Sequence, residues 1–377
     1  MAPKQQPPAT WSHTPVELSI REKVGLFFFG IIGFIKAIVS FSLALPLNRD
    51  FSRKTLLQKF IVKVAQNIAG SPSLTFRQLL SLQKPSGQTI AKTCTLQNLA
   101  HNTITIDADP FPPAALHFID STPDQPGNVL LYFHGGGYIF PASAGHVKFS
   151  HLCAKTANAS LAMLEYTLAP GLKYPGQLAQ AVAAIRFLLK THTPNQIIIG
   201  GDSAGGNLSL AILSHLRDPH PSIPPILRGN GGLEKVVLKA AMCISPRCAN
   251  TRETPSYVQN RDKDIILPAF MDLFAQAWQP NIEEVWATPN KGSVVFWGTI
   301  CAEKVLLAAG SDEVYVDDIR RLGELIGVDD EGKREGGRVV ELVVCEGEVH
   351  TQVVLDTVMG FRDGVMLKRV LEWVERL

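Results

Sequence analysis

The sequence lacks the features by which several classes of protein are first identified. Its six cysteines lie far apart, with no CxxC pair and no cysteine–histidine spacing of the kind that holds zinc. It has no Walker-type phosphate loop and no internal repeat of about 20–50 residues. The 36 basic residues nearly balance 34 acidic ones, so the net charge of +2 gives no basis for binding nucleic acid. We therefore expect no metal, no cofactor and no nucleic-acid partner.

What the sequence does contain is enough apolar material for a large core. Hydrophobic residues make up 46% of the 377 residues and charged residues 19%, which excludes global disorder. The length fits one large α/β domain with additions, or two domains.

The most informative stretch is residues 197–208, IIIGGDSAGGNL. Its isoleucines predict a buried strand, and the leucine-rich residues that follow predict a helix packed on a sheet. Between them, residues 201–205 fit the G-x-S-x-G pattern, a sharp turn with Ser203 at its apex. The new helix points its free N–H groups and positive dipole end at the serine. The five-letter pattern alone fits a glycine-rich turn with a solvated serine equally well, so its flanks and the other motifs must decide.

A second stretch, HGGGY at residues 134–138, directly follows a predicted strand at 128–133. Three consecutive glycines leave a backbone whose N–H groups can point at developing negative charge, which is the arrangement that acyl transfer needs. A flexible loop is the plain alternative. The position after a strand and upstream of the serine is, however, the order of the lipase and esterase oxyanion loop.

Alternating strand and helix patterns predict an α/β fold with a mostly parallel central sheet and helices on both faces. An antiparallel hairpin is predicted from residues 93–96 and 102–106. Residues 250–300 interrupt the alternation with an aromatic helix over 268–278, where a lid or pocket wall would lie. Further strands are predicted at 160–164, 236–244, 304–309 and 339–344.

Acidic and histidine side chains follow the last two predicted strands. Asp312 and Glu313 come after residues 304–309, and His350 comes after 339–344. The carboxyl ends of parallel strands form the functional edge of such a sheet. A serine hydroxyl is a poor nucleophile until a histidine removes its proton, and a carboxylate must hold that histidine. The order serine, acid, histidine is that of the α/β-hydrolases.

On these motifs the chain resembles the hormone-sensitive-lipase-like branch of the α/β-hydrolase family, especially its fungal steryl-acetyl-hydrolase and secondary-metabolite hydrolase group. The resemblance runs from residue 128 to 377 and depends on HGGGY, EYTLAP at 165–170, GDSAGGNL and the late His350. It implies that Ser203 is the nucleophile and His350 the base. It also implies a set of oxyanion residues: the N–H donors Gly136, Gly137 and Ala204, with Gly135 shaping the loop.

The resemblance leaves the acid of the triad open. Counting along the family pattern from Gly310 selects Asp312. Counting back from Asp317 selects Glu313, and members of the fungal group often have a glutamate there. We favour Glu313 slightly and keep both.

The N-terminal part, residues 1–82, is predicted to hold a polar tail, an apolar helix at 24–45 and cap helices, ahead of a catalytic domain at 83–377. Residues 24–45 contain one charge, Lys36, and are about long enough to span a bilayer. They fit a transmembrane anchor, a helix lying in a membrane interface, or a buried or lid helix. These alternatives predict an intracellular protein on the endoplasmic-reticulum membrane or a cytoplasmic one.

Two functions are open at this stage, and oligomeric state is not predicted. The first is a serine carboxylester hydrolase that cleaves short-acyl esters of a hydrophobic alcohol, such as a sterol or fungal metabolite, through an acyl-enzyme. The alternative is a biosynthetic enzyme of a fungal secondary-metabolite pathway, acting on a polyketide-like substrate by cyclisation, condensation or acyl transfer without net hydrolysis. A non-catalytic binding protein is less consistent with an intact His350.

Overall fold

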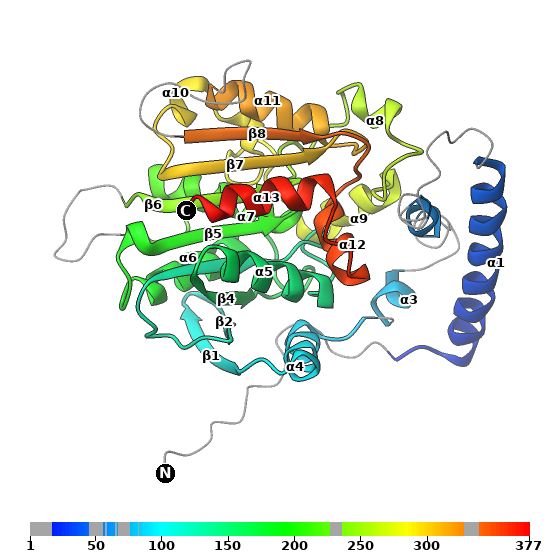
Figure 1. Ribbon diagram of the computed structural model, residues 1–377, viewed down its shortest axis with the longest axis horizontal. Helices are drawn as coiled ribbons and strands as arrows, with labels where there is room; N and C mark the ends of the chain where they lie inside the picture. The colour runs from blue at the N-terminus through cyan, green and yellow to red at the C-terminus, as the bar shows by residue number, and fades with distance from the viewer. Residues whose placement is uncertain are drawn as a thin grey trace, which may run out of the picture.

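The central element is an eight-stranded sheet flanked by helices (Figure 1). The computed structural model describes residues 17–44, 56, 59–64, 66, 76–81, 83–226, 236–327 and 339–377. The strand order is β1-β2-β4-β3-β5-β6-β7-β8, with parallel pairing from β4 to β8. The strands are β1 (His101–Ala108), β2 (Phe111–Ile119), β3 (Asn128–Phe133), β4 (Ala159–Glu165), β5 (Ile197–Asp202), β6 (Leu238–Ile244), β7 (Ala302–Gly310) and β8 (Val339–Cys345).

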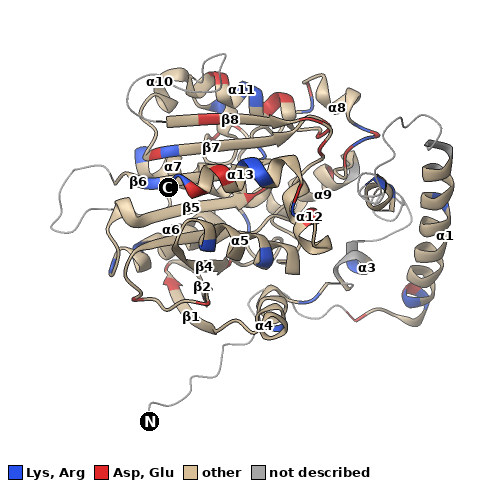
Figure 2. Cartoon of the chain, viewed as in Figure 1, with Lys and Arg blue, Asp and Glu red and all other residues tan. Residues whose placement is uncertain are grey.

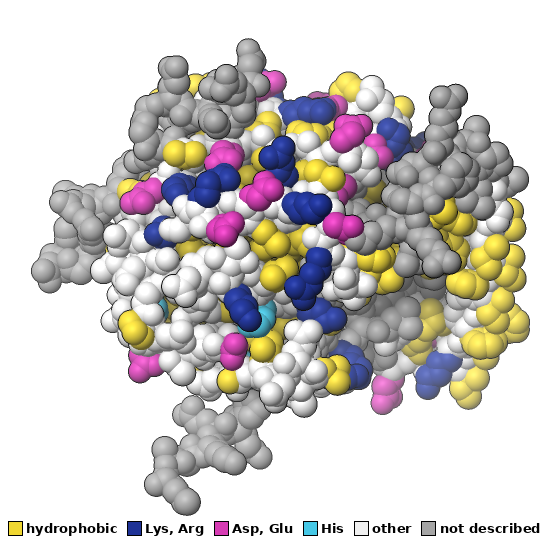
Figure 3. Space-filling model, in the orientation of Figure 1, with side chains coloured by type: hydrophobic (Ala, Val, Ile, Leu, Met, Phe, Trp, Pro, Cys, Tyr) yellow, Lys and Arg dark blue, Asp and Glu magenta, His cyan; other side chains and the backbone are white. Residues whose placement is uncertain are grey.

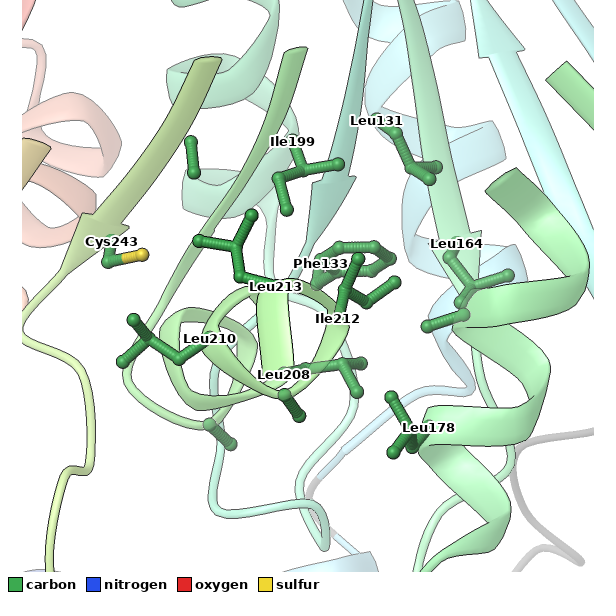
Figure 4. Packing of buried hydrophobic residues seen from close by; sticks show 14 of the residues in the cluster. Leu131, Phe133, Leu164, Leu178, Ile199, Leu208, Leu210, Ile212, Leu213 and Cys243 are labelled. Carbon is green, nitrogen blue, oxygen red and sulfur yellow. The ribbon is translucent and has the colours of Figure 1, made fainter. Parts of the chain in front are cut away.

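Helices cover both faces of the sheet because its central strands are apolar on both sides. In β3, Leu131 and Phe133 enter one core cluster while Leu130 and Tyr132 enter the other. Figure 4 shows the first cluster, where Ile212 of α7 lies beside the Phe133 ring. That cluster includes side chains of α6 (Gly176–Leu188), α7 (Ala204–Arg217), α9 (Pro268–Trp278) and α11 (Val316–Ile326). The opposite cluster includes side chains of α4 (Ser86–Gln97), α5 (Ala144–Thr156), α12 (Gln352–Met359) and α13 (Val365–Glu375). The predicted fold class is confirmed.

The opening antiparallel hairpin is present, but the prediction placed one of its strands wrongly. β1 pairs with β2, whereas residues 93–96 belong to α4. Threonine spacing there suggested a strand, yet the Thr93 and Thr95 hydroxyls bond to backbone carbonyls four residues back, as helical threonines do. Ile90 and Cys94 form a buried stripe with helical spacing.

The apolar N-terminal segment forms α1 (Ile20–Ala44), which stands at the side of the domain (Figure 1). The alternative of a buried helix is wrong, because side chains such as Phe27 are mostly exposed. Among the described residues, no helix is long and apolar enough to cross a membrane. Near its start, α1 is joined to α3 (Phe76–Ser81), where the Gln78 side chain donates to the Glu22 carbonyl. The polar tail at 1–15 lies outside the described residues.

The predicted interruption of the alternation lies between β6 and β7. It contains α9 and two short helices, α8 (Ser256–Gln259) and α10 (Val294–Trp297). The bounds of α9 match the prediction, because Pro268 is at its first position and the apolar residues follow helical spacing. The chain ends in two helices, α12 and α13, because Gly360 ends the first in a left-handed conformation.

Candidate active site

The serine turn brings β5 and α7 into close contact. Ser203 has φ 53° and ψ −112°, a strained conformation that places it at the apex between strand and helix. Its N–H donates to the Ile244 carbonyl at 2.8 Å, which anchors the turn to β6. A Cβ on Gly205 would lie 1.9 Å from the Phe133 carbonyl oxygen, so only glycine permits this approach.

His350 connects the serine to a carboxylate in the turn that follows β7. Its Nε2 lies 2.8 Å from Ser203 Oγ, and its Nδ1 lies 2.9 Å from Glu313 Oε2. Because a carboxylate can only accept, Nδ1 carries the hydrogen and Nε2 is left to accept from the serine hydroxyl. All three residues are at most 8% exposed. The structure therefore assembles a continuous serine–histidine–glutamate chain of hydrogen bonds.

Of the two carboxylates that the sequence left open, only Glu313 reaches the histidine. The Gly310 N–H donates to its other oxygen at 3.1 Å, which turns the side chain back toward the sheet edge. Asp312 points elsewhere and forms a partly exposed ion pair with Lys263 at 3.3 Å.

The charges around His350 favour its protonated form. Burial lowers the pKa of its imidazole, but the Glu313 hydrogen bond and charge, with Asp264 and Asp202, raise it by more. The pKa therefore lies above its ordinary value. A histidine with these neighbours takes up a proton readily, as a general base must.

Two residues that the sequence did not single out hold the loops of the acid and the base. Asp264 Oδ1 accepts from the His350 N–H at 3.0 Å, and its Oδ2 accepts from the Val314 N–H at 2.8 Å. The Asn260 side chain donates to the Glu313 carbonyl at 2.9 Å. Both lie within the interruption between β6 and β7, in a charged run with no recognisable motif. No local signal in the sequence identifies them.

The HGGGY loop starts beside the serine turn and carries free backbone donors. Gly136 and Gly137 have φ values of +110° and +61°. Within the described chain, no acceptor is found for the N–H groups of these two residues or of Ala204. The Gly135 N–H, in contrast, donates to Asp202 Oδ1 at 3.1 Å. The described chain thus has three unused N–H groups, in Ala204 next to the serine and in two glycines of the loop, and a fourth that fastens the loop to the serine turn.

Asp202 is the anchor of that loop. It accepts from the Tyr132 hydroxyl at 2.5 Å and lies 3.2 Å from His146 Nε2. His146 Nδ1 accepts from the Ser143 N–H, so Nε2 is the protonated nitrogen. Burial alone would raise the pKa of Asp202, but these donors bring it below its ordinary value. A charged Asp202 therefore joins the oxyanion loop to the serine turn.

This geometry agrees with a family comparison. Residues 130–354, more than half of the chain, match a protein family described as alpha/beta hydrolase fold. The chain belongs to the α/β-hydrolase family. The motifs that indicated its hormone-sensitive-lipase-like branch all lie in or beside the matched region. Among the described residues of this α/β-hydrolase, no group of histidine, cysteine and acidic side chains is arranged to hold a metal.

Several relatives of this α/β-hydrolase carry the names of hydrolases and esterases. An acetyl-hydrolase of Streptomyces hygroscopicus is 30% identical over 202 residues, covering 52% of this chain and 61% of the relative. The versiconal hemiacetal acetate esterase of Aspergillus parasiticus is 24% identical, covering 42% and 49%. Neutral cholesterol ester hydrolase 1 of Pongo abelii is 36% identical, covering 38% and 35%. The chain thus matches about a third to three fifths of the length of these relatives.

Solved structures agree at the level of the fold. Carboxyl esterase 2 from the mycorrhizal fungus Tuber melanosporum superposes with a TM-score of 0.60 at 18% identity, covering 74% of this chain and 86% of that one. An identity this low shows a shared α/β-hydrolase fold and leaves the activity to be argued from the site.

Proposed function

We propose that this protein is a serine carboxylester hydrolase that works through an acyl-enzyme. The observation that carries the proposal is the hydrogen-bonded chain from Ser203 through His350 to Glu313, at 2.8 and 2.9 Å. The unused N–H groups of Gly136, Gly137 and Ala204 support it, since acyl transfer requires donors at that place.

In the first half of the reaction, Ser203 Oγ attacks the ester carbonyl carbon while its proton passes to His350 Nε2. Negative charge develops on the carbonyl oxygen, where the free backbone donors stabilise it. The C–O bond to the alcohol then breaks, and the alcohol leaves with the proton from Nε2. Glu313 holds the Nδ1 hydrogen and stabilises the charged imidazolium. In the second half, a water molecule replaces the alcohol and the acid product is released.

The proposal is tested with full-length protein and p-nitrophenyl esters. Ser203→Ala should lower kcat by at least about 10³-fold, because the acyl-enzyme has no other nucleophile. A fluorophosphonate probe should label the wild type and leave Ser203→Ala unlabelled. Ser209→Ala, a buried serine bonded within α7, is the matched control. Unchanged turnover in Ser203→Ala would contradict the proposal.

We infer that the substrates are short-acyl esters of a hydrophobic alcohol, such as a sterol or fungal metabolite. The names of the relatives support short acyl groups, since two of them are acetyl-ester hydrolases. The position of α9 supports a short acyl pocket, because its Phe274 ring would lie 2.4 Å from a Cβ on Gly137. An aromatic wall stands directly against the oxyanion loop. Turnover should fall from acetate and butyrate to octanoate, and Phe274→Ala should shift the preference to longer chains. The same preference in both proteins would contradict this role for the ring.

We further propose that α1 contacts a lipid surface. It exposes apolar side chains along its length, including Phe28 and Ile35 (Figure 3). Beyond Glu22, which pairs with Arg77, α1 carries only basic charge (Figure 2). The full-length protein should float with anionic vesicles, and a Phe28→Glu/Ile35→Glu variant should not. Val258→Glu, an exposed apolar residue of α8, is the control. If the Phe28→Glu/Ile35→Glu variant floats as well as Val258→Glu, the proposed contact of α1 with lipid is contradicted.

A further inference from the structure

One arginine near the serine is buried without an ion pair. Arg247 follows β6 and is 5% exposed. Its side-chain Nε and Nη1 have no hydrogen-bond partner among the residues that the structure describes, and no carboxylate there pairs with it. Of the residues that the structure describes, one makes a polar contact with the guanidinium: Asn250 Oδ1 accepts from Nη2. Asn250 is in turn fixed by the Thr288 hydroxyl at 2.5 Å.

This arrangement is unusual for a charged group. A buried charge is costly unless it is paired and hydrogen-bonded, and a guanidinium has five N–H donors to satisfy. The Trp278 ring, 5.8 Å from the guanidinium carbon, offers only a weak cation–π contact. Arg217, in contrast, pairs with Asp218 and donates to Thr299. The Arg247 donors thus remain available for an acceptor that is not part of the described chain.

The guanidinium lies among the residues that surround the triad. The Arg247 backbone N–H donates to the Ser203 carbonyl at 3.3 Å, so the side chain starts beside the serine. Trp278, which it approaches, stacks on Tyr138 of the HGGGY loop at 4.2 Å. The Tyr315 ring meets the His350 ring edge-on at 5.2 Å. Burial raises the pKa of Tyr315 to about 12, and the positive charge of Arg247 opposes that rise.

We propose that Arg247 binds an anionic carboxylate on the substrate, so that the enzyme prefers esters that carry a free acid group. The proposal rests on the proposed ester hydrolysis and narrows its substrate class. A carboxylate supplies the acceptors that Nε and Nη1 lack, and a charge-assisted hydrogen bond in a site closed to water is strong. The acid group can belong to the acyl part or to the alcohol part of the ester, and the two are separated by experiment.

The test compares matched acidic and neutral esters with full-length protein. Mono-p-nitrophenyl glutarate against p-nitrophenyl butyrate places the acid on the acyl side. Acetoxybenzoate against its methyl ester places it on the alcohol side. Each kcat/KM is divided by the rate of alkaline hydrolysis of the same ester. In the wild type, the acidic member of one pair should be favoured by about tenfold or more, mainly through KM.

Three substitutions complete the test. Arg247→Met should reduce that preference by about tenfold or more, and Arg247→Lys, which keeps the charge, should retain part of it. Arg217→Met, which removes a paired arginine remote from the site, should leave the ratio as in the wild type. A wild type without acid preference in either pair would overturn the proposal, as would Arg247→Met lowering both members of a pair equally. Absence of any turnover, or full turnover in Ser203→Ala, would instead contradict the proposed hydrolysis.

Discussion

Ser203 and His350 lie at the same edge of the sheet, but the chain holds them there by different means. Ser203 is placed by a strained turn of its sequence neighbours between β5 and α7, and one bond to the Ile244 carbonyl anchors that turn to β6. His350 is positioned by residues distant in the chain, since Asp264 lies 86 residues before it and Glu313 lies 37 residues before it. The serine half of the active site, the turn between β5 and α7, is thus a local structure that a short stretch of sequence can encode. The histidine half of the active site consists of His350 and the side chains that hold it, Glu313 and Asp264. It forms only when the interruption between β6 and β7 packs against the loops after β7 and β8.

The largest effect should come from the acid of the histidine half. Glu313→Gln should lower kcat by about 10³–10⁴-fold, because the amide can hold the wrong imidazole tautomer and cannot stabilise the imidazolium. Asp312→Asn, which alters the neighbouring ion pair with Lys263, should change kcat by less than about threefold. Rates on p-nitrophenyl butyrate measure both. Equal losses in the two variants would show that the acid role is shared or wrongly assigned.

The serine half should be most sensitive to a side chain added at a glycine of its turn, which should lower the stability of the fold. Gly205→Ala places a Cβ 1.9 Å from the Phe133 carbonyl oxygen, so α7 or β3 must shift. We expect a loss of about 3 kcal/mol in the free energy of unfolding, at the upper end of overpacking costs. Gly30→Ala is the control, since no atom lies within 4 Å of a Cβ there and alanine favours a helix. Denaturant unfolding followed by circular dichroism measures both, and equal midpoints would show that the turn tolerates a side chain.

The same contrast explains what the sequence could predict. The serine turn, the HGGGY loop and α9 are contiguous patterns in which propensity and spacing coincide with the final structure. The placement of Glu313 rather than Asp312 depends on how one short turn folds back onto Gly310, which spacing does not encode. Residues 93–96 fit a strand pattern because threonine favours strands locally, whereas the helix α4 is the structure that buries Cys94 in the core.

Asp264 and Arg247 show more clearly which site residues a sequence cannot predict. Each sits outside any motif, and each is defined by contacts that arise only in the folded chain. Hydrogen bonds between residues 50 or more positions apart leave no periodic trace in a sequence. The support that a charged run within the interruption gives to the catalytic loops exists only in the folded chain.

Asp264→Asn should weaken the histidine half without removing it. Both carboxylate oxygens accept from peptide N–H groups, so an amide nitrogen must face one of these donors and leave it unsatisfied. We expect kcat to fall by about 10–100-fold, corresponding to roughly 1–3 kcal/mol. Loss of fold alone would lower the amount of active enzyme in the same proportion at every pH.

The pH profile of Asp264→Asn separates weakened catalysis from loss of folded enzyme. Burial raises the pKa of Asp264 to about 6, so the carboxylate is charged above that pH, and its charge helps to raise the pKa of His350. His350 must be neutral to act as a base, so activity is lost as the pH falls through its pKa. Removing the charge lowers that pKa, and the acid limb of kcat/KM should move to lower pH. Glu313 and Asp202 remain as raising charges and Tyr315 packs on the ring, so the shift should be partial. An unmoved limb would assign Asp264 a structural role only.

The smallest effect should come from the support behind Asp264. The Gln66 side chain, from the N-terminal part, donates to the Asp264 carbonyl at 2.7 Å and to the Asp262 carbonyl at 3.1 Å. Gln66→Ala should lower the free energy of unfolding by about 1 kcal/mol and kcat by less than about threefold. If Gln66 acts on the triad through Asp264, kcat of the Gln66→Ala/Asp264→Asn variant should equal that of Asp264→Asn alone. Additive losses in kcat would show instead that the N-terminal part reaches the site by a separate route, and the division between a local and a distant half would then extend to a third region of the chain.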